Sequence, residues 1–168
     1  MFARRVSISL VSILTAMLLG ITPAIAGTKT SFTIDVPFTN NSFTLGQTAT
    51  PAGNLHAWDS VGVGTFTSTD ARFQGEITFH TQFLLCKETH PLPCWGPLNA
   101  KWTLDVDSDG QPDWEGISHG LPQNVSTITI RFVGHGLGKY DGLQVTADYH
   151  LNLDSGSEAM TGEILDPH

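Results

Sequence analysis

The fold of this chain is decided by a pattern that is clearest in one stretch, Gln144-Val145-Thr146-Ala147-Asp148-Tyr149-His150-Leu151-Asn152-Leu153. Apolar and polar side chains alternate along it without a break. Successive side chains of a β-strand point to opposite faces of a sheet, so a period of two places the apolar side chains on one face. No stretch after residue 26 carries the apolar stripe of an amphipathic helix. The stretch therefore predicts a half-buried strand.

The same alternation recurs along the chain. It is regular in Ser31 to Val36, Glu76 to Phe83 and Thr127 to Phe132. Weaker patterns between Gly, Pro, Asn and Asp punctuation predict further strands around Leu55–Thr67, Lys101–Asp105, Trp114–His119 and Met160–Leu165. About eight antiparallel strands must protect their edges, and closing the sheet does so. We therefore predict an all-β fold, a closed antiparallel up-and-down barrel of about eight strands, with a β-sandwich as the alternative.

The first residues are typical of a secretory signal peptide. Arg4 and Arg5 precede an apolar stretch from Val6 to Ile21, and the small residues Ala24-Ile25-Ala26 follow. This pattern predicts a signal peptide over 1–26, with cleavage before Gly27. An uncleaved membrane anchor is the alternative, which the Ser, Thr and Pro content disfavours. Residues 27–168 are predicted to form a single domain that is secreted, into a periplasm or the extracellular space.

The charge of the chain limits its partners. The whole sequence has 16 acidic and 8 basic residues, and two of the basic ones lie within residues 1–26, so the remainder carries a net charge of −10. Such a surface repels nucleic acid and anionic membranes. We therefore expect neither as a partner, and no membrane association once the signal peptide has been removed.

One acidic stretch has the spacing of a calcium-binding loop: Asp105-Val106-Asp107-Ser108-Asp109-Gly110-Gln111-Pro112-Asp113. Its carboxylates stand at relative positions 1, 3, 5 and 9, and a glycine at position 6 permits the sharp turn around an ion. Position 12 is Gly116 and not the glutamate of an EF-hand, so the stretch resembles the abbreviated Asp-x-Asp-x-Asp-Gly-x-x-Asp loops of extracellular modules. We predict a structural Ca²⁺ site with oxygen ligands from Asp105, Asp107, Asp109, Gln111 (main chain) and Asp113, and with Glu115 as an extra ligand. The alternative is a solvated acidic turn without an ion.

Two cysteines, Cys86 and Cys94, lie eight residues apart. In a secreted chain such a pair predicts one disulfide. A redox or metal role, shared with His90, is the less favoured interpretation.

A glycine pattern occurs twice, as Gly62-Val63-Gly64-Thr65-Phe66 and as Gly136-Leu137-Gly138-Lys139-Tyr140. Each copy is expected to lead into a strand, where glycines at a spacing of two let an aromatic ring lie over the backbone. The longer stretch from Ile130 to Leu143 is similar to the Gly-x-Gly-x-aromatic-x-Gly hairpin of small eight-stranded barrels, the allene oxide cyclase and dirigent-like proteins. This resemblance implies an up-and-down barrel with a central apolar pocket. Members of these families cyclise or couple small apolar molecules without a cofactor, or have no known activity.

Other chemistry-bearing residues give weaker signals. The six histidines before the C-terminal residue lack metal-ligand spacing and are expected to be scattered over the surface: His56, His80, His90, His119, His135 and His150. No nucleophile motif is found, and the carboxylates Glu76, Asp59 and Asp148 cannot be paired from sequence. The tryptophans are predicted to be core residues, with a sugar-stacking platform as the alternative: Trp58, Trp95, Trp102 and Trp114.

These observations together predict a secreted, calcium-stabilised barrel that binds an apolar small molecule or an extracellular partner without catalysis. Two alternatives stay open. One is a cofactor-free cyclase or isomerase that acts in the barrel lumen, and the other is a carbohydrate-binding module that uses calcium and tryptophan.

Overall fold

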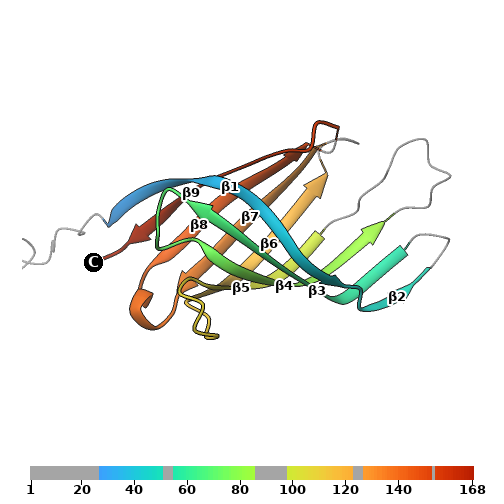
Figure 1. Ribbon diagram of the computed structural model, residues 1–168, viewed down its shortest axis with the longest axis horizontal. Helices are drawn as coiled ribbons and strands as arrows, with labels where there is room; N and C mark the ends of the chain where they lie inside the picture. The colour runs from blue at the N-terminus through green and yellow to red at the C-terminus, as the bar shows by residue number, and fades with distance from the viewer. Residues whose placement is uncertain (1–26, 51–54, 86–97, 123–126, 153) are drawn as a thin grey trace, which may run out of the picture.

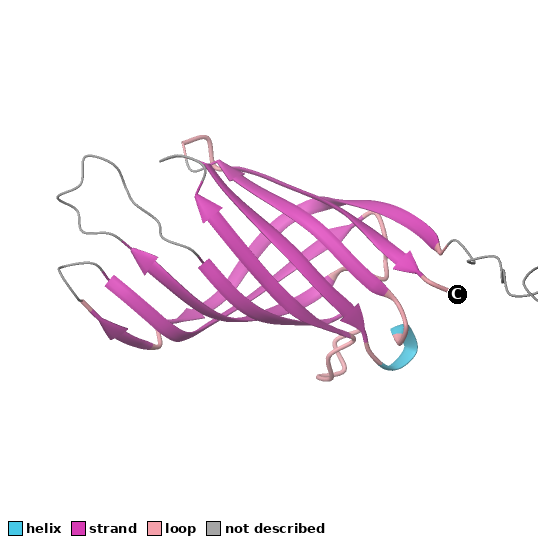
Figure 2. Cartoon of the chain, turned by 180° about the vertical axis from the view of Figure 1, so that it is seen from behind, coloured by secondary structure: helices cyan, strands magenta, loops and turns pink. Residues whose placement is uncertain are grey.

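The computed structural model describes residues 27–50, 55–85, 98–122, 127–152 and 154–168. Most of these residues are in strands, and the one helical element among them is a short 3-10 turn, η2 (Gly138–Tyr140) (Figures 1 and 2). The strands are β1 (Thr28–Thr44), β2 (Gln47–Ala49), β3 (Leu55–Ser68), β4 (Gly75–Leu85), β5 (Leu98–Asp105), β6 (Trp114–Pro122), β7 (Thr127–Gly136), β8 (Gln144–Asn152) and β9 (Ser157–Asp166).

The strands form one closed antiparallel barrel. From β3 to β9, each strand pairs with the next one along the chain, and β1 closes the ring because it pairs with both β9 and β3. The first part of β1 (28–33) pairs with β9, and its second part (34–44) pairs with β3. Eight strands thus make the ring. The short β2 pairs with residues 56–58, near the N-terminal end of β3. The predicted up-and-down barrel is confirmed.

The eight predicted strands are all present, but their lengths differ from the prediction. The expected strand at Ser31–Val36 is part of the much longer β1, and β2 was not predicted at all. Residues 39–49 alternate poorly because most of their side chains are exposed on both faces of the strand. Such a segment is held by its backbone ladder to β3, which leaves little trace in the sequence.

Large side chains fill the end of the barrel that carries the β3–β4, β5–β6 and β7–β8 connections. Phe73, from the β3–β4 turn, is fully buried there, with 0 % of its surface exposed. Its ring packs against Phe32, Phe66, Trp102 and Trp114, with centroid distances from 4.9 to 6.0 Å. This cluster seals the end of the barrel and forms its core.

Hydrogen bonds hold the β3–β4 turn in the shape that directs Phe73 inward. The Ser68 hydroxyl lies 2.8 Å from the carbonyl oxygens of both Asp70 and Phe73. Arg72 forms an ion pair with Asp70, and this pairing lowers the pKa of the Asp70 carboxyl below its ordinary value. The Arg72 carbonyl accepts a hydrogen bond of 2.7 Å from the indole N–H of Trp114. The turn and the core therefore support each other.

Glycines make room for the largest ring of the core. Trp102 on β5 lies beside Gly116 on β6, which in turn pairs with Gly134 on β7. A Cβ atom added at Gly134 would lie 2.5 Å from Cζ2 of Trp102. The ring therefore lies directly on the backbone of two neighbouring strands, which only glycine permits.

The two copies of the Gly-x-Gly-x-aromatic pattern have different structures. Gly62 and Gly64 lie within β3, as expected. In the second copy Gly136 ends β7, and Gly138 adopts a φ of +54°, so the chain enters η2 rather than a strand. Tyr140 then stacks on Trp114 with 5.4 Å between ring centroids. The second copy leads into β8 only through η2 and a turn, because left-handed backbone at Gly138 ends the ladder of β7. The hairpin between β7 and β8 is nevertheless present.

Candidate functional site: a half-open lumen and an acidic turn

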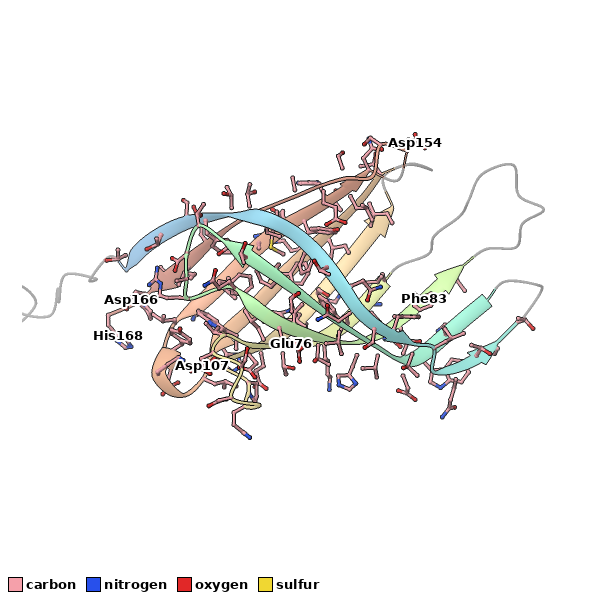
Figure 3. All side chains as sticks on the ribbon, viewed as in Figure 1. Glu76, Phe83, Asp107, Asp154, Asp166 and His168 are labelled. Carbon is pink, nitrogen blue, oxygen red and sulfur yellow. The ribbon has the colours of Figure 1, made fainter. Side chains whose placement is uncertain are left out.

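The two ends of the barrel differ. Asp107 and Asp166 lie at the sealed end, whereas Phe83 and Asp154 lie at the other (Figure 3). Towards this second end the interior holds a cavity of about 250 Å³. Its wall is mainly apolar and comes from six of the ring strands together with Phe38 and Phe43 of β1; the main lining residues are Phe38, Phe43, Phe79, Leu98, Ile130, Phe132 and Tyr149.

Aromatic rings form much of this wall and pack edge to face. Phe38 stands nearly perpendicular to Tyr149, at 83° and 5.2 Å between centroids. Phe38 also contacts Phe79 at 6.5 Å, and Phe79 contacts Phe132 at 6.0 Å. Thr81 and Ser118 add small polar side chains to the same wall, and the Thr81 hydroxyl donates to the Ser60 carbonyl oxygen over 3.2 Å. The cavity is thus lined by rings with few polar groups.

A carboxylate stands beside this aromatic wall. Glu158 on β9 pairs with Leu151 on β8, and it accepts a hydrogen bond of 3.2 Å from the backbone N–H of Phe38. Burial of Tyr149 raises the pKa of its hydroxyl far above the ordinary value, and the negative charge and hydrogen bond of Glu158 add to this shift. Tyr149 therefore keeps its proton at neutral pH.

Sequence reasoning missed both residues of this pair as site residues. Tyr149 alternates in phase with the apolar residues of its strand, so the sequence pattern predicts a core residue at this position. Glu158 precedes the expected strand Met160–Leu165, but the observed β9 begins at Ser157. Extending the alternation of Met160 and Gly162 backwards by two residues would have placed Glu158 on the inner face.

The acidic turn between β5 and β6 is shaped by its own carboxylates. Asp105 accepts backbone N–H groups of Ser108 (2.7 Å) and Gly110 (2.8 Å). Asp109 accepts the N–H of Gln111 over 2.8 Å. Gly110 has a φ of +84°, as expected for the glycine at the turn.

Three of the predicted calcium ligands come together in this turn. Oxygen atoms of Asp105, Asp107 and Asp109 lie within 4.8 Å of one another, so one cation could contact all three. Asp113 does not belong to this group of three, and one oxygen of its carboxylate accepts the Val106 N–H over 2.9 Å. Glu115 lies outside the group: it points outward from β6 and contacts His135 at 3.3 Å.

A lysine from another connection also neutralises the turn. The ammonium group of Lys139, in η2, forms an ion pair with Asp107 and lies 3.3 Å from Asp113. This hydrogen-bonded pair lowers the pKa of the Asp107 carboxyl and raises that of the Lys139 ammonium. A dication is therefore not the only group that can balance these charges, because Lys139 does so in part.

The remaining predicted residues have separate places. Five histidines are exposed on the outside of the barrel: His56, His80, His119, His135 and His150. Their exposure confirms the surface prediction for these five histidines. Of the suggested carboxylates, Asp59 and Glu76 are exposed, whereas Asp148 pairs with Arg131 at 2.7 Å.

Of the three tryptophans that the structure describes, two are buried and one is partly exposed. Trp102 and Trp114 are at most 1 % exposed, which confirms them as core residues and removes them from any sugar-stacking platform beside Asp107. Trp58 lies on the outer face of β3, where its indole N–H donates to Gln47 over 3.1 Å. Trp95, His90 and the predicted disulfide between Cys86 and Cys94 lie outside the described residues.

Comparisons with protein-family models, with curated proteins and with solved structures found no match to this chain. Within the part of the chain that the structure describes, no helix is long and apolar enough to cross a membrane.

Proposed function

We propose that this protein is a secreted, non-catalytic module that holds a small apolar molecule in the open half of its barrel. The cavity of about 250 Å³ carries this proposal. An apolar cavity of about 150 Å³ lined by aliphatic and aromatic side chains is enough to hold benzene. The space is therefore sufficient for a ligand of one or two rings, and burial of that ligand against the phenylalanine side chains supplies the affinity.

A cavity-filling substitution tests this proposal. Thr81→Phe places a ring in the cavity, whereas Thr81→Val keeps the original volume, and both lose the hydrogen bond to Ser60. With 1-aminonaphthalene as a fluorescent apolar probe of two rings, we expect a dissociation constant of roughly 1–100 µM for the unmodified protein. Thr81→Phe should weaken probe binding about tenfold or more, and Thr81→Val less than about twofold. Equal binding by both variants would mean that the probe binds elsewhere, and no saturable binding at all would refute the proposal.

A second candidate function is a cofactor-free cyclase or isomerase that works in the same lumen. It is favoured by the pair of Tyr149, which keeps its proton, and Glu158, which could accept one. The resemblance of the β7–β8 hairpin to allene oxide cyclase and dirigent-like barrels supports the same candidate. Incubating candidate ligands with the protein and analysing them by chromatography and NMR separates the two functions. A binder returns the ligand unchanged, whereas a cyclase or isomerase returns an isomer of the same mass.

We further propose that the acidic turn binds Ca²⁺ as a structural ion, held by Asp105, Asp107 and Asp109. The close approach of their oxygens supports this assignment, and the remaining ligands would come from the main chain at Gln111 and from water. Asp113 would join only if it exchanged Lys139 for the ion. The expected dissociation constant is about 10⁻⁴ to 10⁻³ M, as in other extracellular modules.

Thermal unfolding tests the calcium proposal. In 10 mM Ca²⁺ we expect the melting temperature to rise by roughly 3–10 °C. The double substitution Asp107→Ala with Asp109→Ala should abolish the rise, whereas the matched pair Asp154→Ala with Glu163→Ala, away from the turn, should retain it. Lys139→Gln should strengthen Ca²⁺ binding because a competing ammonium is removed. If the melting temperature of the unmodified protein did not change on addition of Ca²⁺, the proposed calcium site would be refuted.

A further inference from the structure

The carboxylate of Glu158 is directed into the barrel rather than towards the solvent. Paired residues of an antiparallel ladder share one face, so Glu158 lies on the same face as its partner Leu151 and as Tyr149. Glu158 is partly buried and accepts a hydrogen bond from the backbone N–H of Phe38, which lines the cavity together with Tyr149. Its negative charge therefore adjoins the aromatic wall.

No cationic side chain balances this charge in the part of the chain that the structure describes. The ion pairs there involve Lys29, Arg72, Arg131, His135 and Lys139, and each of these has another acidic partner. Instead, the carboxylate accepts a hydrogen bond from the backbone N–H of Phe38. A partly buried carboxylate without a cation is costly, and that cost falls when a ligand brings the positive charge.

The aromatic wall favours the same kind of ligand. Phe38, Phe79, Phe132 and Tyr149 meet edge to face, so their ring faces are turned in different directions around the cavity. The face of an aromatic ring carries negative charge density, and cages of such rings recognise quaternary ammonium groups. The net negative charge of the protein also concentrates cations near its surface.

We propose that the lumen is selective for apolar organic cations, that is, tertiary or quaternary ammonium groups carrying an apolar body. In this assignment the apolar body fills the space lined by Leu98, Ile130 and Phe132. The ammonium group lies against the rings of Phe38 and Tyr149, on the side of Glu158. This inference rests on the proposed function, because it specifies the ligand of the same cavity.

Two probes of nearly identical shape test the selectivity. Phenyltrimethylammonium is cationic, and tert-butylbenzene is its neutral isostere with carbon in place of nitrogen. In NMR titrations of the unmodified protein we expect the cation to bind about tenfold more tightly or better. Glu158→Gln should reduce this preference to less than about twofold while leaving the neutral probe unaffected. The matched control is Glu163→Gln on the same strand, which removes the same charge from the outer face, where Glu163 pairs with Lys29.

Each outcome decides a different claim. Equal affinity of the two probes for the unmodified protein would overturn the cation selectivity and leave the proposed apolar site intact. Absence of binding by either probe would refute both. A preference that survives Glu158→Gln but not Glu163→Gln would show that general surface charge, and not the lumen carboxylate, selects the cation.

Discussion

Replacing Phe73 by alanine is expected to lower the free energy of unfolding by about 3–5 kcal/mol. This side chain is fully buried among four other rings, so its removal leaves a cavity that they cannot fill without moving. Loss of the ring also releases the β3–β4 turn from the core. Urea unfolding followed by tryptophan fluorescence measures the effect directly, because Trp102 and Trp114 both contact Phe73.

A matched control separates this packing effect from a general loss of hydrophobicity. Phe43 is 52 % exposed, so Phe43→Ala should cost less than about 1 kcal/mol. Phe73→Leu keeps an apolar side chain at the same place and should cost about half as much as Phe73→Ala. If Phe43→Ala and Phe73→Ala destabilised the protein equally, the ring cluster around Phe73 would not be the centre of the core.

The sequence could predict the barrel because alternation is a local property. Each strand with one buried face, such as Glu76–Phe83 or Gln144–Asn152, carries the period of two within its own residues. Phe73 shows where this signal ends. It belongs to no strand and has no period, and its burial depends on the turn formed by Ser68 and Asp70 and on the space between distant strands.

The contacts of the candidate sites differ in the same way, since some lie within one short turn and others join residues that are distant in the sequence. The spacing of Asp105, Asp107 and Asp109 brings their oxygens together because the three residues share one short turn. Lys139, which neutralises that turn, lies 32 residues from Asp107 in the sequence, and only the packing of η2 brings the two together. Glu158 and Phe38 are likewise 120 residues apart and meet where β1 closes the ring. Contacts of this kind depend on the topology of the barrel, which no local sequence pattern predicts.

Gly116→Ala is expected to destabilise the barrel by about 3 kcal/mol or more. The added Cβ would overlap the carbonyl oxygen of Val133 and would lie 2.5 Å from Cζ2 of Trp102. Neither obstacle can move freely, because one is part of the β6–β7 ladder and the other is a fully buried indole. The measurement is again the free energy of unfolding in urea.

Gly120→Ala is the matched control, since Gly120 lies four residues further along β6 on the same inner face. A Cβ atom there would meet only side chains, Leu98 at 3.2 Å and Ile130 at 3.3 Å, which can shift by a few tenths of an ångström. We expect a cost below about 1 kcal/mol. If the tryptophan ring is the main obstacle at Gly116, combining Gly116→Ala with Trp102→Leu should cost at least about 1 kcal/mol less than the sum of the two single substitutions. Strict additivity would instead assign the whole penalty to the backbone of β7, and would mean that the glycines serve strand packing rather than the ring.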